Sequence, residues 1–421
     1  MQWNPDLPYN SLPLLPPATE IETKQVLRAT TEARAALATL NQVIRFIPEP
    51  VILLNALPLI EAQASSEIEN ILTTRDDLFQ HFENETISSS PELKETFRYR
   101  RAVFSAIDFL DTRPLSFSVA QHVCSEIKNR QMDIRTLPGT FIGNATTGAA
   151  VYTPPEGRDV LHSLISNWEE FLHSTTELDP LIAMAVMHYQ FEAIHPFSDG
   201  NGRTGRVLNI LFLLEKRLLT LPILYLSRFI ITHKEEYYSK LLAVTQNAAW
   251  EEWILFMLNA VRETCERTTD LVEEIFSLYN TYISLFREVP GVRNDPYLVN
   301  VLFAKPFCRI SDVVEKCGVT RLTATKWLES LQKAGILEDK KVGRDRIFIN
   351  RRFYEILREI VREHRQFNPR EFRIVAAPDV IDLFLEEENQ FLAQLGDFIG
   401  KPITLQAEGS FRQEQYDIVL S

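Results

Sequence analysis

Apolar residues recur at helical spacing over most of the first 290 positions, and this pattern predicts a mainly helical protein. The clearest helical segments are residues 22–44, 59–74, 160–174, 179–194 and 205–219. Segment 179–194 is mostly apolar, so we expect it in the middle of a helical core. It ends at His195-Pro196, because proline disfavours the α conformation in the residue before it.

Two stretches interrupt the helical pattern. Residues 1–18 are proline-rich, which favours an extended segment over the surface. Residues 134–160 hold two short β-prone pieces on either side of a Gly/Asn/Thr turn, which predicts a β-hairpin. The helical core is therefore expected to carry one small hairpin.

The pattern changes again at Pro296, after a connecting helix expected at residues 271–290. The expected elements are helices at 297–304, 309–319 and 320–339, then a two-stranded ribbon at 339–349 with Gly343 at its tip. This order resembles a winged helix-turn-helix, with residues 320–334 as its recognition helix. The last residues predict a strand at 371–377, an amphipathic helix at 379–399 and two strands within 403–420.

These elements predict a mainly α fold with five regions. They are an N-terminal helical region (1–115), an all-helical core with the hairpin (116–270), a connecting helix (271–295), a winged helix-turn-helix (296–365) and a small α/β unit (366–421). Charge follows the division, since Lys+Arg minus Asp+Glu is 15 − 9 = +6 over 301–365, 4 − 10 = −6 over 366–421 and −13 over 1–300. A basic segment between two acidic ones indicates separate tasks along the chain.

Composition fits a globular protein that can bury a core, with 45% hydrophobic and 24% charged residues. The four cysteines form no CxxC pair, which indicates reduced buried thiols. The N-terminus lacks the basic start and apolar run of a secretory signal. The apolar run 51–60 is too short to span a bilayer and contains Pro58. We therefore expect a cytoplasmic protein without membrane contact.

The stretch HPFSDGNGRTGR, residues 195–206, lies between two expected helices. A loop that leads into a helix N-terminus presents free N–H groups and the positive end of the helix dipole to an anion. Gly200 and Gly202 let the backbone approach a ligand closely. Arg203 and Arg206 are three residues apart, so both guanidinium groups can face the same phosphates.

Asp199 and His195 add metal and proton chemistry to this anion site. A carboxylate beside phosphates is repelled unless a cation such as Mg²⁺ bridges the two. The charge of His195 changes near neutral pH, so this residue could take a proton from an attacking hydroxyl. No GxxxxGK[ST] sequence occurs, which excludes a Walker A site.

These twelve residues match HPFx[DE]GNGRxxR, and the chain resembles the Fic family over about residues 1–270. The resemblance implies an enzyme that moves AMP from ATP to a Ser, Thr or Tyr hydroxyl of a protein. It implies His195 as the base, Asp199 as the Mg²⁺ ligand and Arg206 as the partner of the γ-phosphate. The residues implied in ATP binding are Glu69, His195, Gly200, Asn201, Gly202, Arg203, Thr204, Gly205, Arg206 and Tyr237.

The family's flap, a hairpin that aligns the target side chain, resembles residues 140–155, with Ile142, Gly143 and Tyr152 as its members. Residues 234–241 resemble the segment that closes the adenine pocket, where Tyr237 is the candidate. The alternative for Tyr237 is a tyrosine that packs against its own helix.

An inhibitory motif of the family, [ST]xxxE[GN], matches Ser65, Glu69 and Asn70 within the expected helix 59–74. Taken alone, this is a surface helix with acidic residues. Beside a Fic core, the resemblance implies that Glu69 pairs with Arg206 and keeps it from the γ-phosphate. In some relatives the same glutamate helps to remove AMP from the target, so the reverse reaction stays open.

The winged helix-turn-helix offers basic and polar residues for DNA: Arg321, Thr323, Lys326 and Lys333 on the recognition helix, and Lys340, Lys341, Arg344 and Arg346 on the ribbon. Protein contacts or dimerisation are the alternative. Residues 370–421 resemble the C-terminal end of ribonuclease E/G proteins. That family's catalytic acidic pair and CPxCxG link are missing, so we expect no nuclease activity.

Two classes of function follow. One is an autoinhibited protein AMP transferase that uses ATP and Mg²⁺, with an unknown target protein and the chain itself as one candidate. The other is a DNA-binding regulator whose core senses ATP. His195 favours the first, since sensing needs no base. Transfer of another nucleotide, and a monomer or a homodimer, stay open.

Overall fold

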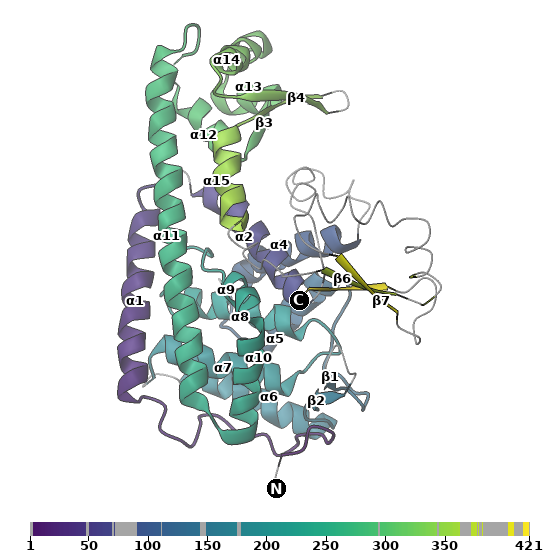
Figure 1. The fold of residues 1–421 in the computed structure, drawn as a ribbon. Helices are drawn as coiled ribbons and strands as arrows, with labels where there is room; N and C mark the ends of the chain where they lie inside the picture. Colours follow the sequence, from purple (N-terminus) through teal and green to yellow (C-terminus); the bar gives the residue numbers. More distant parts are fainter. Residues whose placement is uncertain are drawn as a thin grey trace. The chain divides into compact units, whose positions relative to one another are not determined.

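The computed structural model describes residues 3–47, 50–69, 71, 91–110, 112–143, 149–174, 178–293, 295–342, 345–362, 372–376, 378, 381, 403–407 and 416–420. The chain forms two compact units, Met1–Arg358 and Glu359–Ser421. Helices make up most of the first unit, so the mainly α fold class is confirmed (Figure 1).

Ten described helices precede the winged part of the chain. They are α1 (Lys24–Ile44), α2 (Val51–Ile68), α4 (Pro91–Leu110), α5 (Phe117–Lys128), α6 (Arg158–Ser174), α7 (Pro180–Ile194), α8 (Asn201–Glu215), α9 (Ser227–Thr232), α10 (Lys234–Asn247) and α11 (Trp250–Glu288). Helix α7 is buried along almost its whole length, as its apolar sequence predicts. Trp168 of α6 and Trp253 of α11 donate to α7 carbonyls at 3.0 and 2.8 Å. These two bonds fix the flanking helices to the central one.

Helix α2 differs from the expected helix 59–74. It begins at Val51, contains Pro58 and ends at Ile68, with Glu69 as its C-cap. An interior proline costs a helix about 3 kcal/mol, whereas burying one large aliphatic side chain contributes about 1.5–3 kcal/mol. Ile52, Leu53 and Leu59 are at most 1% exposed, so burial of the apolar run outweighs the proline.

Helix α11 is one continuous element of 39 residues, and the expected boundary at residue 271 falls inside it. The apolar stripe continues across that point, because Leu271, Val272 and Ile275 are buried like the residues before them. Helix α1 lies alongside α11 (Figure 1). The boundary predicted between the helical core and the connecting helix therefore does not coincide with the end of a helix.

The predicted hairpin is confirmed as strands β1 (Ile142–Gly143) and β2 (Ala150–Tyr152), which pair antiparallel with Ile142 opposite Tyr152. The N-terminal segment extends along this part of the core. Tyr9 N–H donates to the Thr153 carbonyl at 3.0 Å. Farther along, Leu15 exchanges two hydrogen bonds with the Asn167 amide of α6.

The predicted order of three helices and a two-stranded ribbon is present after residue 295, in a segment that belongs to the first unit up to Arg358. Its elements are α12 (Pro296–Ala304), β3 (Phe307–Arg309), α13 (Ile310–Cys317), α14 (Arg321–Lys333), β4 (Glu338–Val342), β5 (Asp345–Ile349) and α15 (Arg351–Arg362). The strands form an antiparallel sheet in the order β3-β5-β4. Strand β3 was not predicted, because its three residues are too few for a period to show. The ribbon tip with Gly343 lies outside the described residues.

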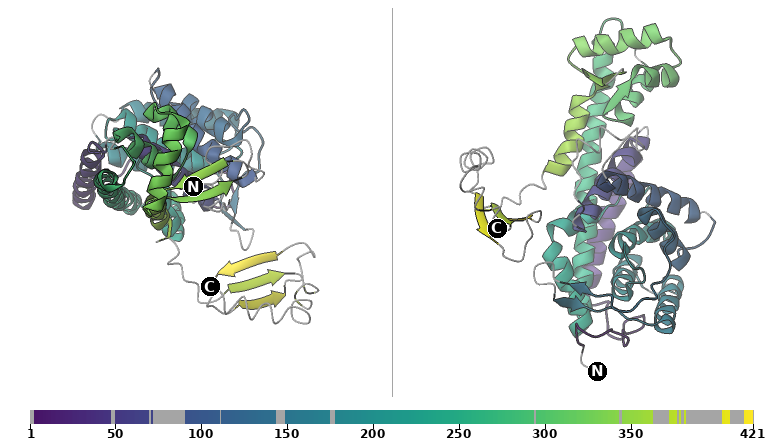
Figure 2. Two further views of the ribbon diagram at one scale, coloured as in Figure 1. Left: turned by 90° about the horizontal axis from the view of Figure 1, so that it is seen from above. Right: turned by 90° about the vertical axis from the view of Figure 1, so that its right-hand side faces the viewer.

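The second unit holds strands β6 (Phe372–Ala376), β7 (Ile403–Ala407) and β8 (Tyr416–Leu420) in the order β7-β6-β8 (Figure 2). Strand β6 pairs parallel with β7 and antiparallel with β8. The three predicted strands are thus confirmed. The predicted helix 379–399 lies almost entirely outside the described residues.

Two expectations from composition can be compared with the structure. None of the four cysteines forms a disulfide; Cys124, Cys265 and Cys308 are buried and Cys317 is half-buried. In the part of the chain that the structure describes, none of the helices combines the length and apolarity that crossing a membrane requires.

Candidate active site

Residues 195–200 of the HPFSDGNGRTGR stretch form a tight loop between α7 and α8, and residues 201–206 form the first turns of α8. Phe197 N–H donates to Asn201 Oδ1 at 2.9 Å, and Asn201 Nδ2 donates back to the Phe197 carbonyl at 2.8 Å. The Phe197 ring is fully buried and stacks on Phe117 with ring centroids 5.4 Å apart. Gly200, with φ +85°, is the N-cap of α8. The loop is therefore fixed by its own amide pair and by the core.

His195 caps the C-terminus of α7 in a left-handed conformation (φ 50°, ψ 58°), which a residue with a side chain rarely adopts. Arg135 holds this turn. Its N–H donates to the Pro196 carbonyl at 2.9 Å, and its Nε donates to the His195 carbonyl at 2.8 Å. The same guanidinium donates to Pro155, after the hairpin. No motif marks Arg135, so the sequence could not predict this contact.

The environment of His195 favours the neutral imidazole. Burial lowers its pKa to about 4, and the positive charge of Arg135 acts in the same direction. Near neutral pH the ring is therefore uncharged and able to accept a proton. Its Nδ1 is buried and has no hydrogen-bond partner among the described residues.

Glu69 and Ser65, at the end of α2, reach Arg206 on α8. Arg206 is 3% exposed and donates from Nε to Ser65 Oγ at 2.8 Å. Its Nη2 donates to the Ser65 carbonyl and to Glu69 Oε1, both at 2.9 Å. Burial would lower the pKa of Arg206, but the Glu69 carboxylate raises it, so the guanidinium stays charged. Asn70 lies outside the described residues.

The same carboxylate lies against the first turn of α8. A Cβ on Gly202 would come within 2.4 Å of Glu69 Oε1, so glycine is needed for this approach. Free N–H groups at a helix N-terminus attract anions. Glu69 therefore places its own negative charge beside N–H groups that would attract a phosphate.

Helix α2 is anchored by a second, deeply buried acid, Glu61. It accepts hydrogen bonds from Tyr99 Oη at 3.0 Å, from Ser227 N–H at 3.3 Å and from the Ser227 hydroxyl. Burial raises the pKa of Glu61 to about 7. These bonds fix α2 one turn before Ser65 and so help to set the position of Glu69.

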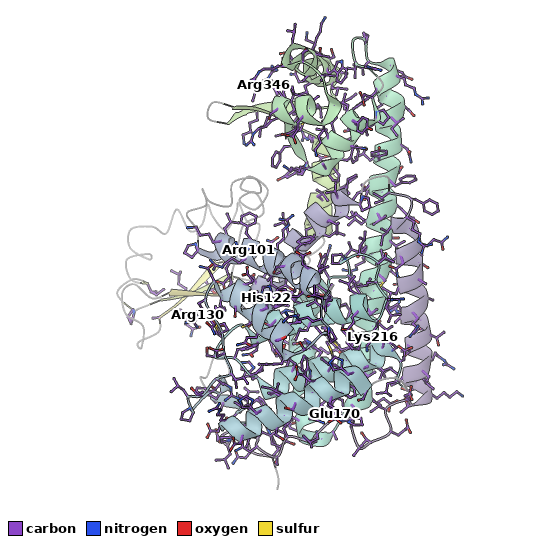
Figure 3. All side chains as sticks on the ribbon, turned by 180° about the vertical axis from the view of Figure 1, so that it is seen from behind. Arg101, His122, Arg130, Glu170, Lys216 and Arg346 are labelled. Atoms are coloured by element: carbon purple, nitrogen blue, oxygen red, sulfur yellow. The ribbon has the colours of Figure 1, made fainter. Side chains whose placement is uncertain are left out.

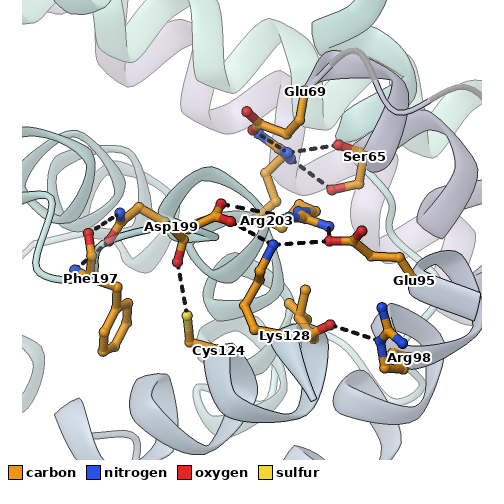
Figure 4. Close-up of polar contacts among 12 residues, drawn as sticks. Ser65, Glu69, Glu95, Arg98, Cys124, Lys128, Phe197, Asp199 and Arg203 are labelled. Carbon is orange, nitrogen blue, oxygen red and sulfur yellow. Dashed lines mark hydrogen bonds and ion pairs between the residues drawn. The ribbon is translucent and has the colours of Figure 1, made fainter. Parts of the chain in front are cut away.

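Four charged side chains form a row beside the loop (Figure 4). Lys128 Nζ lies 2.6 Å from Asp199 Oδ2 and 3.3 Å from Glu95 Oε1. Arg203 NH1 lies 2.5 Å from the same Glu95 oxygen, and its NH2 lies 4.0 Å from Asp199 Oδ1. Burial would raise the pKa of Asp199, but the Lys128 ammonium lowers it. Sequence reasoning missed Lys128 and Glu95, which lie on α5 and α4.

Asp199 fits a Mg²⁺ ion that arrives with phosphates. Mg²⁺ prefers oxygen ligands and often takes one carboxylate together with substrate phosphates and water. Within the described ranges no group of three or more His, Cys, Asp or Glu residues is placed to hold a metal. Asp199 is half-exposed and already faces one cation, the Lys128 ammonium. Phosphate oxygens and water would have to complete the coordination.

The residues expected in the flap divide into two kinds. Tyr152 is 7% exposed, and its hydroxyl donates to the Ala193 carbonyl of α7 at 2.8 Å. Ile142 is half-buried and Gly143 is exposed on the opposite strand. Tyr152 thus anchors the hairpin to α7, while the β1 strand is the part that a target could reach.

Tyr237 is placed inside the core. It is 2% exposed, and its hydroxyl lies 2.8 Å from His188 Nε2. This geometry matches the alternative of a tyrosine packed in its helix environment. Tyr238 beside it is 42% exposed, and its ring packs edge-on against that of Tyr237. An adenine contact of Tyr237 stays a prediction, and Tyr238 is the more accessible of the two rings.

His188 leads to a prediction on stability against pH. Burial lowers its pKa to about 3 from the usual 6.5, so the unfolded chain binds an extra proton between these values. Unfolding free energy should therefore fall as pH drops, by about 2–3 kcal/mol between about pH 7 and pH 4.5. Urea unfolding should show a loss that is about 2–3 kcal/mol larger in wild type than in His188→Gln, because His195 and other buried groups titrate in both proteins. Replacement of the exposed His162 is the control, and parallel pH curves for wild type and His188→Gln would contradict the prediction.

The candidate DNA-binding residues lie on α14 and on the ribbon. Arg321 and Lys326 on α14 and Lys340 on β4 are exposed. Arg346, which is labelled in Figure 3, is already paired with Glu329 at 2.7 Å and with Asp339 at 2.8 Å. Lys341 is in β4, and Arg344 lies outside the described residues. DNA binding stays a prediction, and among the described candidates the exposed cations are Arg321, Lys326 and Lys333 on α14 and Lys340 on β4.

Parts of this chain match known protein families and individual relatives. Residues 27–108 match the Fic/DOC family N-terminal region, residues 114–213 the Fic/DOC family, and residues 292–353 the C-terminal domain of SoFic-like protein adenylyltransferases. A probable protein adenylyltransferase of Aquifex aeolicus is 26% identical over 181 residues, 42% of this chain and 53% of that protein. Ribonuclease G of Escherichia coli is 40% identical over 67 residues, 16% of this chain and 14% of that protein.

A solved structure shows the same fold. The crystal structure of a Fic family protein from Desulfovibrio desulfuricans aligns with a TM-score of 0.51 at 20% identity, covering 79% of this chain and 98% of that one. With the three family matches and the loop geometry, the chain belongs to the Fic family. It spans about half the length of the Aquifex relative and a small part of ribonuclease G.

Proposed function

We propose that this protein is a Mg²⁺-dependent protein adenylyltransferase that moves AMP from ATP to a Ser, Thr or Tyr hydroxyl of a target protein. We further propose that Glu69 holds it inactive. Relatives named as protein adenylyltransferases support the reaction class. The observation that carries the proposal is the position of the Glu69 carboxylate, against Gly202 and Arg206 at the N-terminus of α8.

The residues of the loop divide the work. The backbone N–H groups at the start of α8, together with Arg203 and Arg206, hold the phosphates. Asp199 would hold Mg²⁺, and the chemistry this ion would supply is neutralisation of charge on the leaving phosphates. The target oxygen forms a bond to the α-phosphorus while the bond to pyrophosphate breaks. The hydroxyl proton goes to the neutral imidazole of His195.

Glu69 would act by competition for Arg206. While Arg206 donates to Glu69 and Ser65, it cannot also donate to a γ-phosphate. ATP could then enter without its γ-phosphate being held, so the α-phosphorus would not face the target hydroxyl. AMP removal from the target remains a second reaction of the same site.

The reaction class is tested by the position of the label in ATP. The Glu69→Gly protein is incubated with Mg²⁺ and ATP labelled either at the α- or at the γ-phosphate, and protein is then separated on a denaturing gel. Adenylyl transfer puts only the α-label on protein, with one added AMP per site in mass spectrometry. Incorporation of the γ-label would show phosphoryl transfer instead, and bound ATP without either label would contradict the transferase.

A further inference from the structure

Asp199, the candidate metal ligand, already has a cation. Lys128 Nζ lies 2.6 Å from Asp199 Oδ2, which is within hydrogen-bond distance for an ammonium and a carboxylate. Mg²⁺ binds carboxylate oxygen at about 2.0–2.1 Å. An ion at that distance from Oδ2 would lie close to the ammonium, and two positive charges so near each other repel strongly. Lys128 and Mg²⁺ therefore compete for one oxygen.

Lys128 has a second carboxylate within reach. Its Nζ lies 3.3 Å from Glu95 Oε1, on the other side from Asp199. The Lys128 and Glu95 side chains are 17% and 16% exposed, so the pair is held by the surrounding helices rather than by solvent. The ammonium can therefore leave Asp199 and keep a carboxylate partner.

Glu95 also ties Lys128 to the phosphate side of the loop. The same Oε1 accepts from Arg203 at 2.5 Å, and the Arg203 side chain is only 2% exposed. Arg203 Nε is buried and has no hydrogen-bond partner among the described residues. One carboxylate thus holds two cations next to the place where metal and phosphates are expected.

We propose that Lys128 is an internal competitor of Mg²⁺: its ammonium neutralises Asp199 in the nucleotide-free protein, and Glu95 receives it when Mg²⁺-nucleotide binds. The proposal rests on the proposed nucleotide site. As a consequence, Lys128 sets the Mg²⁺ concentration that nucleotide binding requires. Without nucleotide the ammonium neutralises the Asp199 carboxylate, and the metal binds Asp199 only when phosphates supply further ligands.

The test measures Mg²⁺ dependence of nucleotide binding, not turnover. The probe is α,β-methylene ATP, in which the bond to be broken is replaced. Its affinity is titrated against Mg²⁺ by calorimetry in the Glu69→Gly protein and in the same protein with Lys128→Met. The midpoint is the Mg²⁺ concentration that gives half of the full increase in nucleotide affinity. Lys128→Met should lower this midpoint on the order of tenfold, the factor expected for about 1.4 kcal/mol. Mn²⁺ binding seen by electron paramagnetic resonance should shift in the same direction.

Two matched variants separate this mechanism from others. Lys128→Arg keeps the charge and should leave the midpoint within about twofold. Arg34→Met removes a cation that pairs with Asp179 at the N-terminus of α7, the end opposite the loop, and should not change the midpoint. An unchanged or raised midpoint in Lys128→Met, with normal nucleotide binding, would overturn the proposal for Lys128 and leave the proposed function intact. Failure of every variant to bind the nucleotide, with or without Mg²⁺, would instead contradict the proposed function.

Discussion

Replacing Glu69 with glycine is expected to raise AMP transfer by about 10- to 100-fold. The change removes one charge-assisted hydrogen bond on Arg206, at 2.9 Å, and such bonds contribute about 1.5–3 kcal/mol. Arg206 keeps its two bonds to Ser65, so its buried guanidinium stays oriented toward the start of α8. The freed amine can then donate to a γ-phosphate. The gain should appear in the transfer rate at saturating ATP, because the brake acts on the bound pose.

The measurement is the initial rate of α-label incorporation by wild type and Glu69→Gly at equal concentration. Glu67→Gly is the matched control, since it places the same helix-weakening residue on α2, two positions before Glu69. Glu69→Gln should give an intermediate rate, because an amide can still accept from Arg206 but carries no charge. Equal rates in wild type and Glu69→Gly would remove the brake from the proposal.

The sequence predicted the framework of this site because each part has a local signal. Helix α7 is apolar on nearly all sides, and the glycines mark the turn into α8. Ser65, Glu69 and Arg206 could be connected only through the family resemblance, since 137 residues separate the two ends of the ion pair. The spacing of residues along the sequence predicts which side chains are neighbours on one helix, but not which side chains of two different helices meet.

The parts that the sequence did not predict depend on contacts between distant segments. Arg135 fixes the left-handed turn at His195 from a loop 60 residues earlier, and nothing in its own neighbours indicates that role. Lys128 is an ordinary last-turn lysine of α5 until the fold brings Asp199 to 2.6 Å from it. For Tyr237, the choice between an adenine contact and a packed ring depends on whether the side chain is buried. The sequence has two adjacent tyrosines, and it does not indicate which of them is the buried one.

Replacing His195 is expected to abolish transfer while ATP still binds. General-base catalysis by a positioned side chain contributes about 10²- to 10⁴-fold, and the neutral imidazole is the proton acceptor that the proposal places at the attacking hydroxyl. The phosphate donors lie elsewhere, on the first turn of α8 and on Arg203 and Arg206. In the Glu69→Gly background, His195→Ala should therefore lose at least about 100-fold in rate, with ATP affinity within about twofold.

The left-handed backbone at His195 requires a second variant. Alanine is disfavoured at φ 50°, so His195→Ala could also disturb the loop. Asparagine adopts this conformation more readily and lacks a base of suitable pKa, so His195→Asn should be equally inactive with an undisturbed loop. Rates come from α-label transfer and affinities from calorimetry with α,β-methylene ATP. A near-normal rate in His195→Asn would assign the proton to another acceptor. Loss of ATP affinity in both variants would make His195 a structural element of the loop, because removal of a base alone leaves the phosphate contacts in place.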